Sequence, residues 1–198
     1  HLFNIFHGTT LQTIRGSEIR VPSGGGRKIV RFPLPMGELP VYYTGHAESV
    51  SIPRNLAGLT EVTLHGGVQP SYIPLLIMLM DKTGLFSTHA RRKMAAEFFY
   101  KIENIFGAAG LDRSVGRVDV FGLHEGKTAH RTYAYVGHIG QITAVPCVVA
   151  ALWELDGRFK EAPGGVYSPE RLLGDPEPFL SEVMRRGVDM FFHEDGLQ

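Results

Sequence analysis

The feature that most constrains the fold of this chain is a pair of alternating segments joined by a short turn. Residues 115–123 and 128–136 alternate apolar and polar side chains on either side of the dipeptide Glu125-Gly126. A period of two is typical of strands with one buried face, and a glycine-containing turn between two such runs predicts a β-hairpin. The two strands of a hairpin pair antiparallel, so we expect at least one antiparallel sheet.

Helical patterns occupy much of the remaining chain. They predict helices at residues 70–84, 87–106 and 140–155 and a shorter helix that Asp175 caps. A weaker helical pattern covers the first 14 residues. Further strands are predicted at residues 18–21 and 28–32, which we expect to pair through the glycines at 24–26, and at residues 41–44, 61–65 and 188–192. Because the helices come in runs, the sequence predicts an α+β fold, with a largely antiparallel mixed sheet and helices packed on one face.

Composition narrows the classes of function. The 198 residues include 20 basic and 20 acidic side chains, so the chain has no excess positive charge with which to bind nucleic acid or an anionic membrane. Its longest apolar runs, residues 73–80 and 139–155, are shorter than the roughly 20 residues that a membrane span requires, and we expect both to be buried in the core. The single cysteine, Cys147, cannot form an internal disulfide, and we therefore expect a cytoplasmic protein.

The length suits one domain, and we expect residues 1–198 to form it. The chain begins with His1 and has neither an initiator methionine nor a leader with a cleavage site. We interpret it as part of a longer protein.

Motifs of several common chemistries do not occur. The sequence has no HExxH, no cysteine pair, no GxSxG, no Walker loop and no dinucleotide-binding glycine pattern. His124, His130 and His138 surround the predicted hairpin, but no third metal ligand is evident, and surface roles are favoured for them. Cys147 lies in an apolar helical segment, where a thiol is usually inert packing.

Residues 45–54 gather polar side chains between glycine and proline, and we interpret this segment as a loop at a strand end. It contains His46, Glu48, Ser49 and Arg54. An arginine binds a carboxylate through two parallel hydrogen bonds, whereas a histidine transfers protons near neutral pH and a glutamate orients it or holds an ammonium group. These residue types fit a recognition site for an amino acid, and they fit equally well a structural loop in which Arg54 pairs with a neighbouring acid.

The order of several short motifs along the chain carries a resemblance to a known family. The motifs are FPLPMG at 32–37, GHAES at 45–49, IPR at 52–54, GG at 66–67, LFS at 85–87, GQITA at 140–144, GVYSPE at 165–170 and DPEPFL at 175–180. In this order they resemble the C-terminal domain of saccharopine dehydrogenase-like proteins. The resemblance spans most of the chain, although each motif is short.

This resemblance implies that the whole protein is an NAD(P)-dependent oxidoreductase that acts on the C–N bond of an amino acid or its imine. NAD(P) would bind to a preceding Rossmann domain, which no part of this chain resembles. The resemblance implies catalytic roles for His46 and Glu48, which would contact the amine or manage its proton. It implies substrate contacts for Arg54, which would bind the carboxylate, and for Ser49 and Thr143.

We also expect a homodimer. Helices on one face of a sheet leave the other face uncovered, and Tyr133 and Tyr135 are expected to be exposed on the sheet. The alternative is a non-catalytic binding or assembly module with the same fold. We expect no nucleic-acid partner, no membrane partner, and no NAD(P)H binding by this chain on its own.

Overall fold

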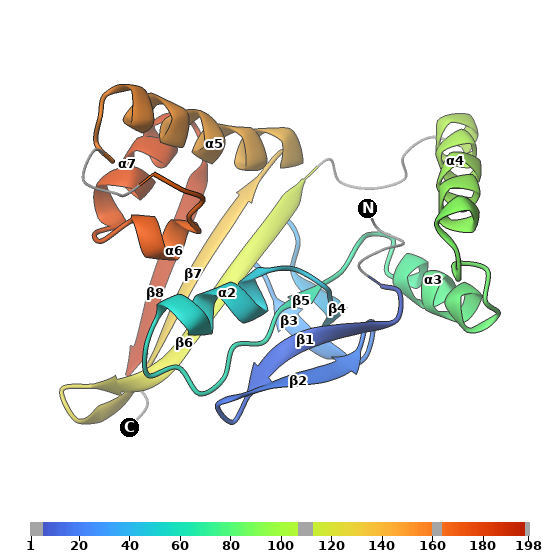
Figure 1. Cartoon of the computed structure of the whole chain (residues 1–198), viewed down its shortest axis with the longest axis horizontal. Coiled ribbons are helices and arrows are strands. Elements are labelled where there is room, and N and C mark those ends of the chain that lie inside the picture. Colours follow the sequence, from blue (N-terminus) through green and yellow to red (C-terminus); the bar gives the residue numbers. More distant parts are fainter. Residues whose placement is uncertain (1–5, 107–112, 160–163, 197–198) are drawn as a thin grey trace. The chain divides into compact units, whose positions relative to one another are not determined.

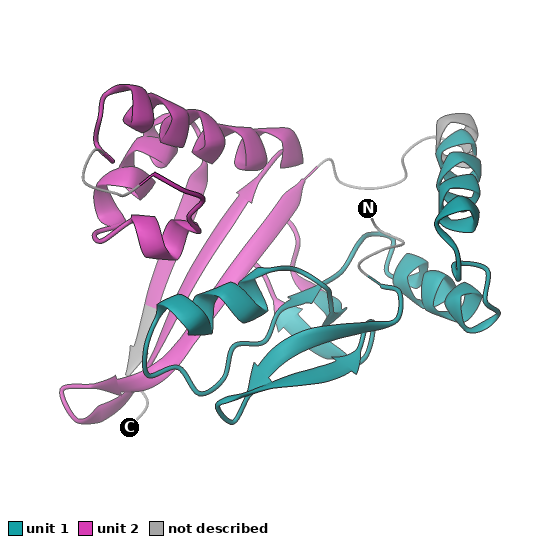
Figure 2. Cartoon of the chain, in the orientation of Figure 1, with its two compact units in different colours: residues 1–30, 39–111 teal, residues 31–38, 112–198 magenta. Residues whose placement is uncertain are grey.

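A computed structural model describes residues 6–106, 113–159 and 164–196 (Figure 1). Over these residues the fold is α+β, with six helices and three small antiparallel sheets. The chain forms two compact units, shown in Figure 2: unit 1 consists of residues 1–30 and 39–111, and unit 2 of residues 31–38 and 112–198. This division by packing does not test the expectation of one domain, which stays a prediction.

Unit 1 begins with a hairpin of two strands, β1 (Thr9–Ile14) and β2 (Ser17–Pro22). The turn residues Arg15 and Gly16 have φ angles of 53° and 74°. Positive φ at both positions is what a two-residue turn of type I′ requires. The prediction of helical structure in the first 14 residues is therefore wrong for β1.

The predicted pairing of residues 18–21 with 28–32 is also wrong, because β2 pairs with β1 instead. The strand β3 (Lys28–Arg31) belongs to a second sheet, of order β3-β4-β5, with β4 (Glu38–Tyr43) and β5 (His65–Gly66). β4 confirms the strand predicted at residues 41–44. The strand predicted at 61–65 is shorter than expected and is limited to β5 and one bridge between Val62 and Thr13.

Three helices complete unit 1: α2 (Glu48–Asn55), α3 (Tyr72–Lys82) and α4 (His89–Phe106). α2 replaces the loop predicted at 45–54. The other two helices were expected, and the predicted cap of α4 is present, since the Thr88 hydroxyl accepts a hydrogen bond from the Arg91 amide at 3.3 Å. The side chains of residues 102–106, at the end of the predicted apolar stripe, lie outside the described residues. The core of unit 1 contains Phe6, Tyr42, Ile77, Phe86 and Ala95.

Unit 2 contains the sheet β6-β7-β8, formed by β6 (Ser114–His124), β7 (Lys127–Gly137) and β8 (Asp189–Gly196). The predicted hairpin is confirmed in full. Its turn residues, Glu125 and Gly126, have φ angles of 52° and 77°, the same geometry as the turn between β1 and β2.

The helices of unit 2 lie together beside this sheet (Figure 1). They are α5 (Ile139–Leu155), α6 (Pro169–Leu172) and α7 (Glu177–Arg185). Their shared core contains Val149, Trp153, Val183 and Val188. The predicted cap of the last helix is present, because the Asp175 carboxylate accepts a hydrogen bond from the Glu177 amide at 3.0 Å.

Two expectations about α5 are wrong. The helix is not buried all round, and Cys147 is exposed rather than packed in the core. The apolar pattern gave no indication of this, because both faces of α5 carry apolar side chains. None of the described helices combines the length and the apolar character that a membrane span requires.

Candidate functional site

Most of the predicted site residues lie on α2 or next to it. His46 precedes the helix, Glu48 and Ser49 begin it, and Arg54 lies in its last turn. Thr143 lies on α5, in unit 2. Its hydroxyl donates to the Ile139 carbonyl at 2.7 Å, one helical turn earlier. A substrate contact of Thr143 stays a prediction. The Thr143 hydroxyl already donates its proton within the helix, so it would contact a substrate as an acceptor.

Ser49 fixes α2 to β1. It is fully buried, and its hydroxyl contacts the carbonyl oxygens of Leu11 at 2.7 Å and His46 at 3.2 Å. Its own carbonyl accepts a hydrogen bond from the Thr13 hydroxyl at 3.1 Å. The usual helical donor to that carbonyl would be the amide of residue 53, but Pro53 has no N–H. Thr13 thus replaces the hydrogen bond that the proline removes, and Ser49 positions the helix.

The charged residues of α2 face solvent. His46 Nδ1 lies 4.0 Å from Glu48 Oε2. The Arg54 side chain is 63% exposed, and its Nη2 and Nε lie 2.7 and 2.9 Å from Glu18 Oε1 on β2. This ion pair is the structural alternative that the sequence left open. Because exposed ion pairs contribute little free energy, Arg54 remains able to bind a second carboxylate in place of Glu18.

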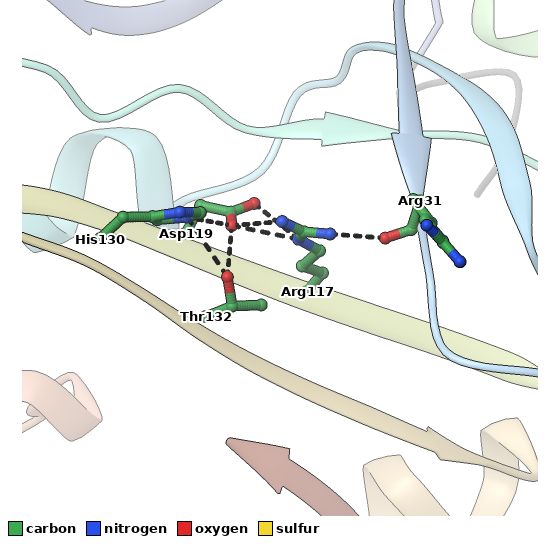
Figure 3. Close-up of polar contacts among 5 residues, drawn as sticks. All are labelled: Arg31, Arg117, Asp119, His130 and Thr132. Atoms are coloured by element: carbon green, nitrogen blue, oxygen red, sulfur yellow. Dashed lines mark hydrogen bonds and ion pairs between the residues drawn. The ribbon is translucent and has the colours of Figure 1, made fainter. Parts of the chain in front are cut away.

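A larger polar network lies on β6 and β7 (Figure 3). Alternate residues of a strand share a face, and Asp119 lies opposite Thr132 in the register of the hairpin. Asp119 Oδ1 accepts hydrogen bonds from Arg117 Nη2 at 2.8 Å and from Thr132 Oγ1 at 2.9 Å, and His130 Nε2 lies 2.7 Å away. Arg117 Nε also donates to Asp119 Oδ2 at 2.9 Å. One carboxylate therefore holds three side chains.

Further contacts orient this network. Arg117 Nη1 donates to the Arg31 carbonyl at 2.6 Å, as Figure 3 shows. The Phe121 ring stacks on the His130 ring with centroids 4.2 Å apart and planes 9° apart. The His130 side chain is 15% exposed and that of Asp119 is 28% exposed. The imidazole is thus fixed between a carboxylate and an aromatic ring and still reaches solvent.

The charge of Asp119 is stabilised by its partners. Burial alone would raise the pKa of the carboxyl group, but the hydrogen bonds from Arg117, His130 and Thr132 outweigh this effect and lower the pKa below its usual value. The carboxylate therefore remains ionised near neutral pH and orients His130 through Nε2. A histidine held in this way can accept or donate a proton, and the same contacts can simply stabilise a solvent-facing sheet.

Sequence reasoning named His130 only as a possible metal ligand and missed Arg117, Asp119 and Thr132. The signal was present, since Asp119 and Thr132 stand at matching distances from the turn at Glu125-Gly126. His138 accepts a hydrogen bond from the Gly140 amide at 3.1 Å and so caps α5. No group of three or more potential metal ligands occurs among the residues that the structure describes.

Unit 1 also contains an open cavity of about 520 Å³. Its walls come from the turn at residues 23–25 and from α3, and they are mainly apolar. The lining side chains include Phe6, Met78, Asp81 and Lys82. None of the predicted site residues lines this cavity.

No family model matches the chain, and no curated protein is significantly similar to it. The resemblance to saccharopine dehydrogenase-like proteins therefore depends on the order of the short motifs alone.

Proposed function

We propose that this chain is the substrate-binding and dimerisation domain of a saccharopine dehydrogenase-like, NAD(P)-dependent oxidoreductase. The proposed reaction takes place at the C–N bond of an amino acid or its imine, in the cytoplasm. The observation that carries the proposal is that Glu48 and Arg54 lie on one short helix, which the buried Ser49 anchors, and that His46 directly precedes it. The position of α5, α6 and α7 beside β6-β8 supports the proposed architecture, a sheet with helices on one face.

In the proposed complex, the Arg54 guanidinium binds the carboxylate of the amino acid and displaces Glu18 from its exposed ion pair. Glu48 attracts the substrate ammonium group, and His46, 4.0 Å away, accepts its proton. Ser49 acts through the position of α2, and Thr143 is a further proposed contact. The contribution of this chain is to bind and orient the substrate.

In the described part of the chain, the connection from β7 to α5 does not suit NAD(P). The connection from β7 to α5 contains Gly137 and Gly140, but a dinucleotide pyrophosphate binds to free amides at a helix start. Here the His138 side chain already accepts the hydrogen bond of the Gly140 amide. The proposal therefore assigns the dinucleotide to a preceding domain.

Calorimetric titration of the 198-residue chain with a panel of L-amino acids tests this function. We expect Arg54→Ala to weaken the binding about 10- to 100-fold, as loss of a charged bidentate contact does. Glu18→Gln should tighten it several-fold, because a competing carboxylate is removed. Arg20→Ala is the matched control, since Arg20 is an exposed arginine on the same strand as Glu18. Equal affinity of the wild type and Arg54→Ala, or no binding by the wild type, would contradict the proposal.

One observation favours the alternative, a non-catalytic binding or assembly module. Val118, Tyr133 and Phe192 are cross-strand neighbours on one face of β6-β8, and they are 56%, 43% and 57% exposed. Exposed apolar side chains that adjoin one another mark interaction surfaces. This alternative predicts a chain that binds a protein and no amino acid, so the same titration separates the two functions.

A further inference from the structure

We propose that two copies of this chain associate through α5, which packs antiparallel against the same helix of the second copy. The proposal rests on the proposed function only in that both include a homodimer. It places the dimer interface on α5 and not on the uncovered face of the sheet. α5 has 17 residues and a single charged side chain, Glu154. A helix that is apolar all round is normally buried.

The described residues of unit 2 cover one side of α5. Ile142, Val145, Val149 and Trp153 pack into the core with α7 and β8. The opposite side, which we call the outer face, carries the apolar side chains of Ala144, Cys147, Val148, Ala151, Leu152 and Leu155 and the polar side chains of Thr143 and Glu154, all of them exposed. The exposed fractions of Val148 and Leu155 are 52% and 83%. Spacings of three and four residues place these side chains along one stripe.

The pattern of the outer face is self-complementary about its centre. Cys147 is the middle residue of Ile139–Leu155, so a two-fold axis there brings the two Cys147 side chains together. Ala144 and Ala151 lie on either side of this point, and such small side chains let two helices approach closely. The larger Val148, Leu152 and Leu155 would flank the contact.

The one charge on α5 also fits a second copy. Glu154 is exposed and lies two turns after Cys147, in line with it. In an antiparallel pair its carboxylate would lie beside the start of the partner helix, at the position of Gly140. The start of a helix carries partial positive charge, which attracts a carboxylate. A parallel pair would instead bring the two Glu154 carboxylates together.

Light scattering of the wild-type chain and cross-linking with a short bismaleimide test the proposal. Cys147 is the only cysteine, so every cross-linked dimer joins Cys147 to Cys147. We expect a dimer mass and rapid cross-linking of the wild type, and no cross-linking of Cys147→Ser. A monomer would overturn the proposal. If Cys147 of that monomer is also protected from maleimide, another part of the same chain covers the outer face of α5. A dimer without cross-linking would overturn it as well.

Two matched variants locate the interface. Ala151→Glu places two like charges near the two-fold axis while keeping a good helix former, and we expect it to raise the dimer dissociation constant at least tenfold. Val118→Glu, on the exposed face of the sheet, should leave the dimer intact. Circular dichroism checks that both variants fold. If only Val118→Glu separates the dimer, α5 is excluded and the expectation of a sheet-face homodimer survives. The effect of Arg54→Ala in the amino-acid titration concerns α2 and is independent of either result.

Discussion

Two polar networks in this molecule differ in burial and in charge. In unit 1, Gln12, Thr13 and Ser49 are at most 4% exposed, and they bind backbone groups through hydroxyl and amide atoms. In unit 2, Asp119 and Arg117 are charged, and their side chains and that of His130 reach solvent. A buried neutral group is costly to leave unpaired, whereas an exposed ion pair contributes little. The network in unit 1 should therefore contribute more to the free energy of unfolding. The network in unit 2 can change its charge while the fold persists.

The largest effect is expected at Gln12. Its Oε1 accepts a hydrogen bond from the Leu64 amide at 2.7 Å, and its Nε2 donates to the Thr44 carbonyl at 3.4 Å. Gln12→Leu keeps the volume but leaves both backbone groups without these partners, which should cost about 2–5 kcal/mol of the free energy of unfolding. Urea denaturation measures it, together with hydrogen exchange of residues 9–14 and 62–66.

The control for Gln12 is Gln141, whose amide donates to the Gly187 carbonyl at 2.8 Å in an exposed setting. Gln141→Leu should cost under about 1 kcal/mol, because water replaces the lost partner. Equal losses from the two substitutions would contradict the distinction between buried and exposed networks.

Ser49→Ala should come next. Loss of the hydroxyl leaves the half-buried Leu11 carbonyl without this donor, at an expected cost of about 1–3 kcal/mol. Because Ser49 anchors α2, hydrogen exchange of residues 46–56 should also become faster. Ser51→Ala, on the same helix, should change stability by no more than about 0.5 kcal/mol. An unchanged exchange rate at α2 in Ser49→Ala would contradict the anchoring role.

A pH-dependent effect of intermediate size is expected from His65. Burial, assisted by the charge of Lys28, lowers the pKa of His65 from 6.5 to about 4. Between those values the unfolded chain binds more protons than the folded chain, so stability falls as the pH drops from 6.5 towards 4. We expect a loss on the order of 1–2 kcal/mol after allowance for solvent screening.

Urea midpoints measured at several pH values test this expectation. His65→Gln should remove the slope between pH 6.5 and 4, while His89→Gln, at an exposed position, should retain it. An NMR titration of His65 with a midpoint above 6 would contradict the assignment.

The smallest effect is expected at Asp119. Asp119→Asn should reduce stability by no more than about 1 kcal/mol at pH 7, because solvent screens the exposed network. The pKa of Asp119 is lowered in the folded state, so its contribution is complete above the ordinary value of 3.8 and is lost as the pH falls below it. The free energies of unfolding of the wild type and Asp119→Asn should therefore become equal in acid. Glu61→Gln should not differ from the wild type in this way. A loss at pH 7 as large as that of Gln12→Leu would contradict the comparison.

The two hairpins show how far the sequence predicts this fold. Arg15-Gly16 and Glu125-Gly126 form the same type of turn, yet only the second was predicted. The alternation of apolar and polar side chains predicts β6 and β7. In β1 the buried residues include Thr10 and Gln12, and because these are polar, the strand shows no such alternation. Apolar periodicity detects strands with an apolar face, and it does not detect a strand that buries hydrogen-bonded polar groups.

The candidate site was predicted in part for a similar reason. Local composition identified His46, Glu48 and Arg54, but Pro53 led us to predict a loop. The structure has a helix there, because the Thr13 hydroxyl replaces the hydrogen bond that Pro53 cannot donate. That compensation comes from a residue distant in the sequence. The network around Asp119 depends on strand register, which becomes visible only when the hairpin is paired residue by residue.

The most direct test of the central claim is an NMR titration of the isotope-labelled 198-residue chain with an L-amino acid that binds to it. If Arg54 binds the substrate carboxylate, the amide shifts concentrate at residues 45–55, saturate, and disappear in Arg54→Ala while persisting in Arg20→Ala. Shifts that leave α2 unchanged and map instead to the cavity beside α3, or that survive in Arg54→Ala, would show that the amino acid does not bind at Arg54.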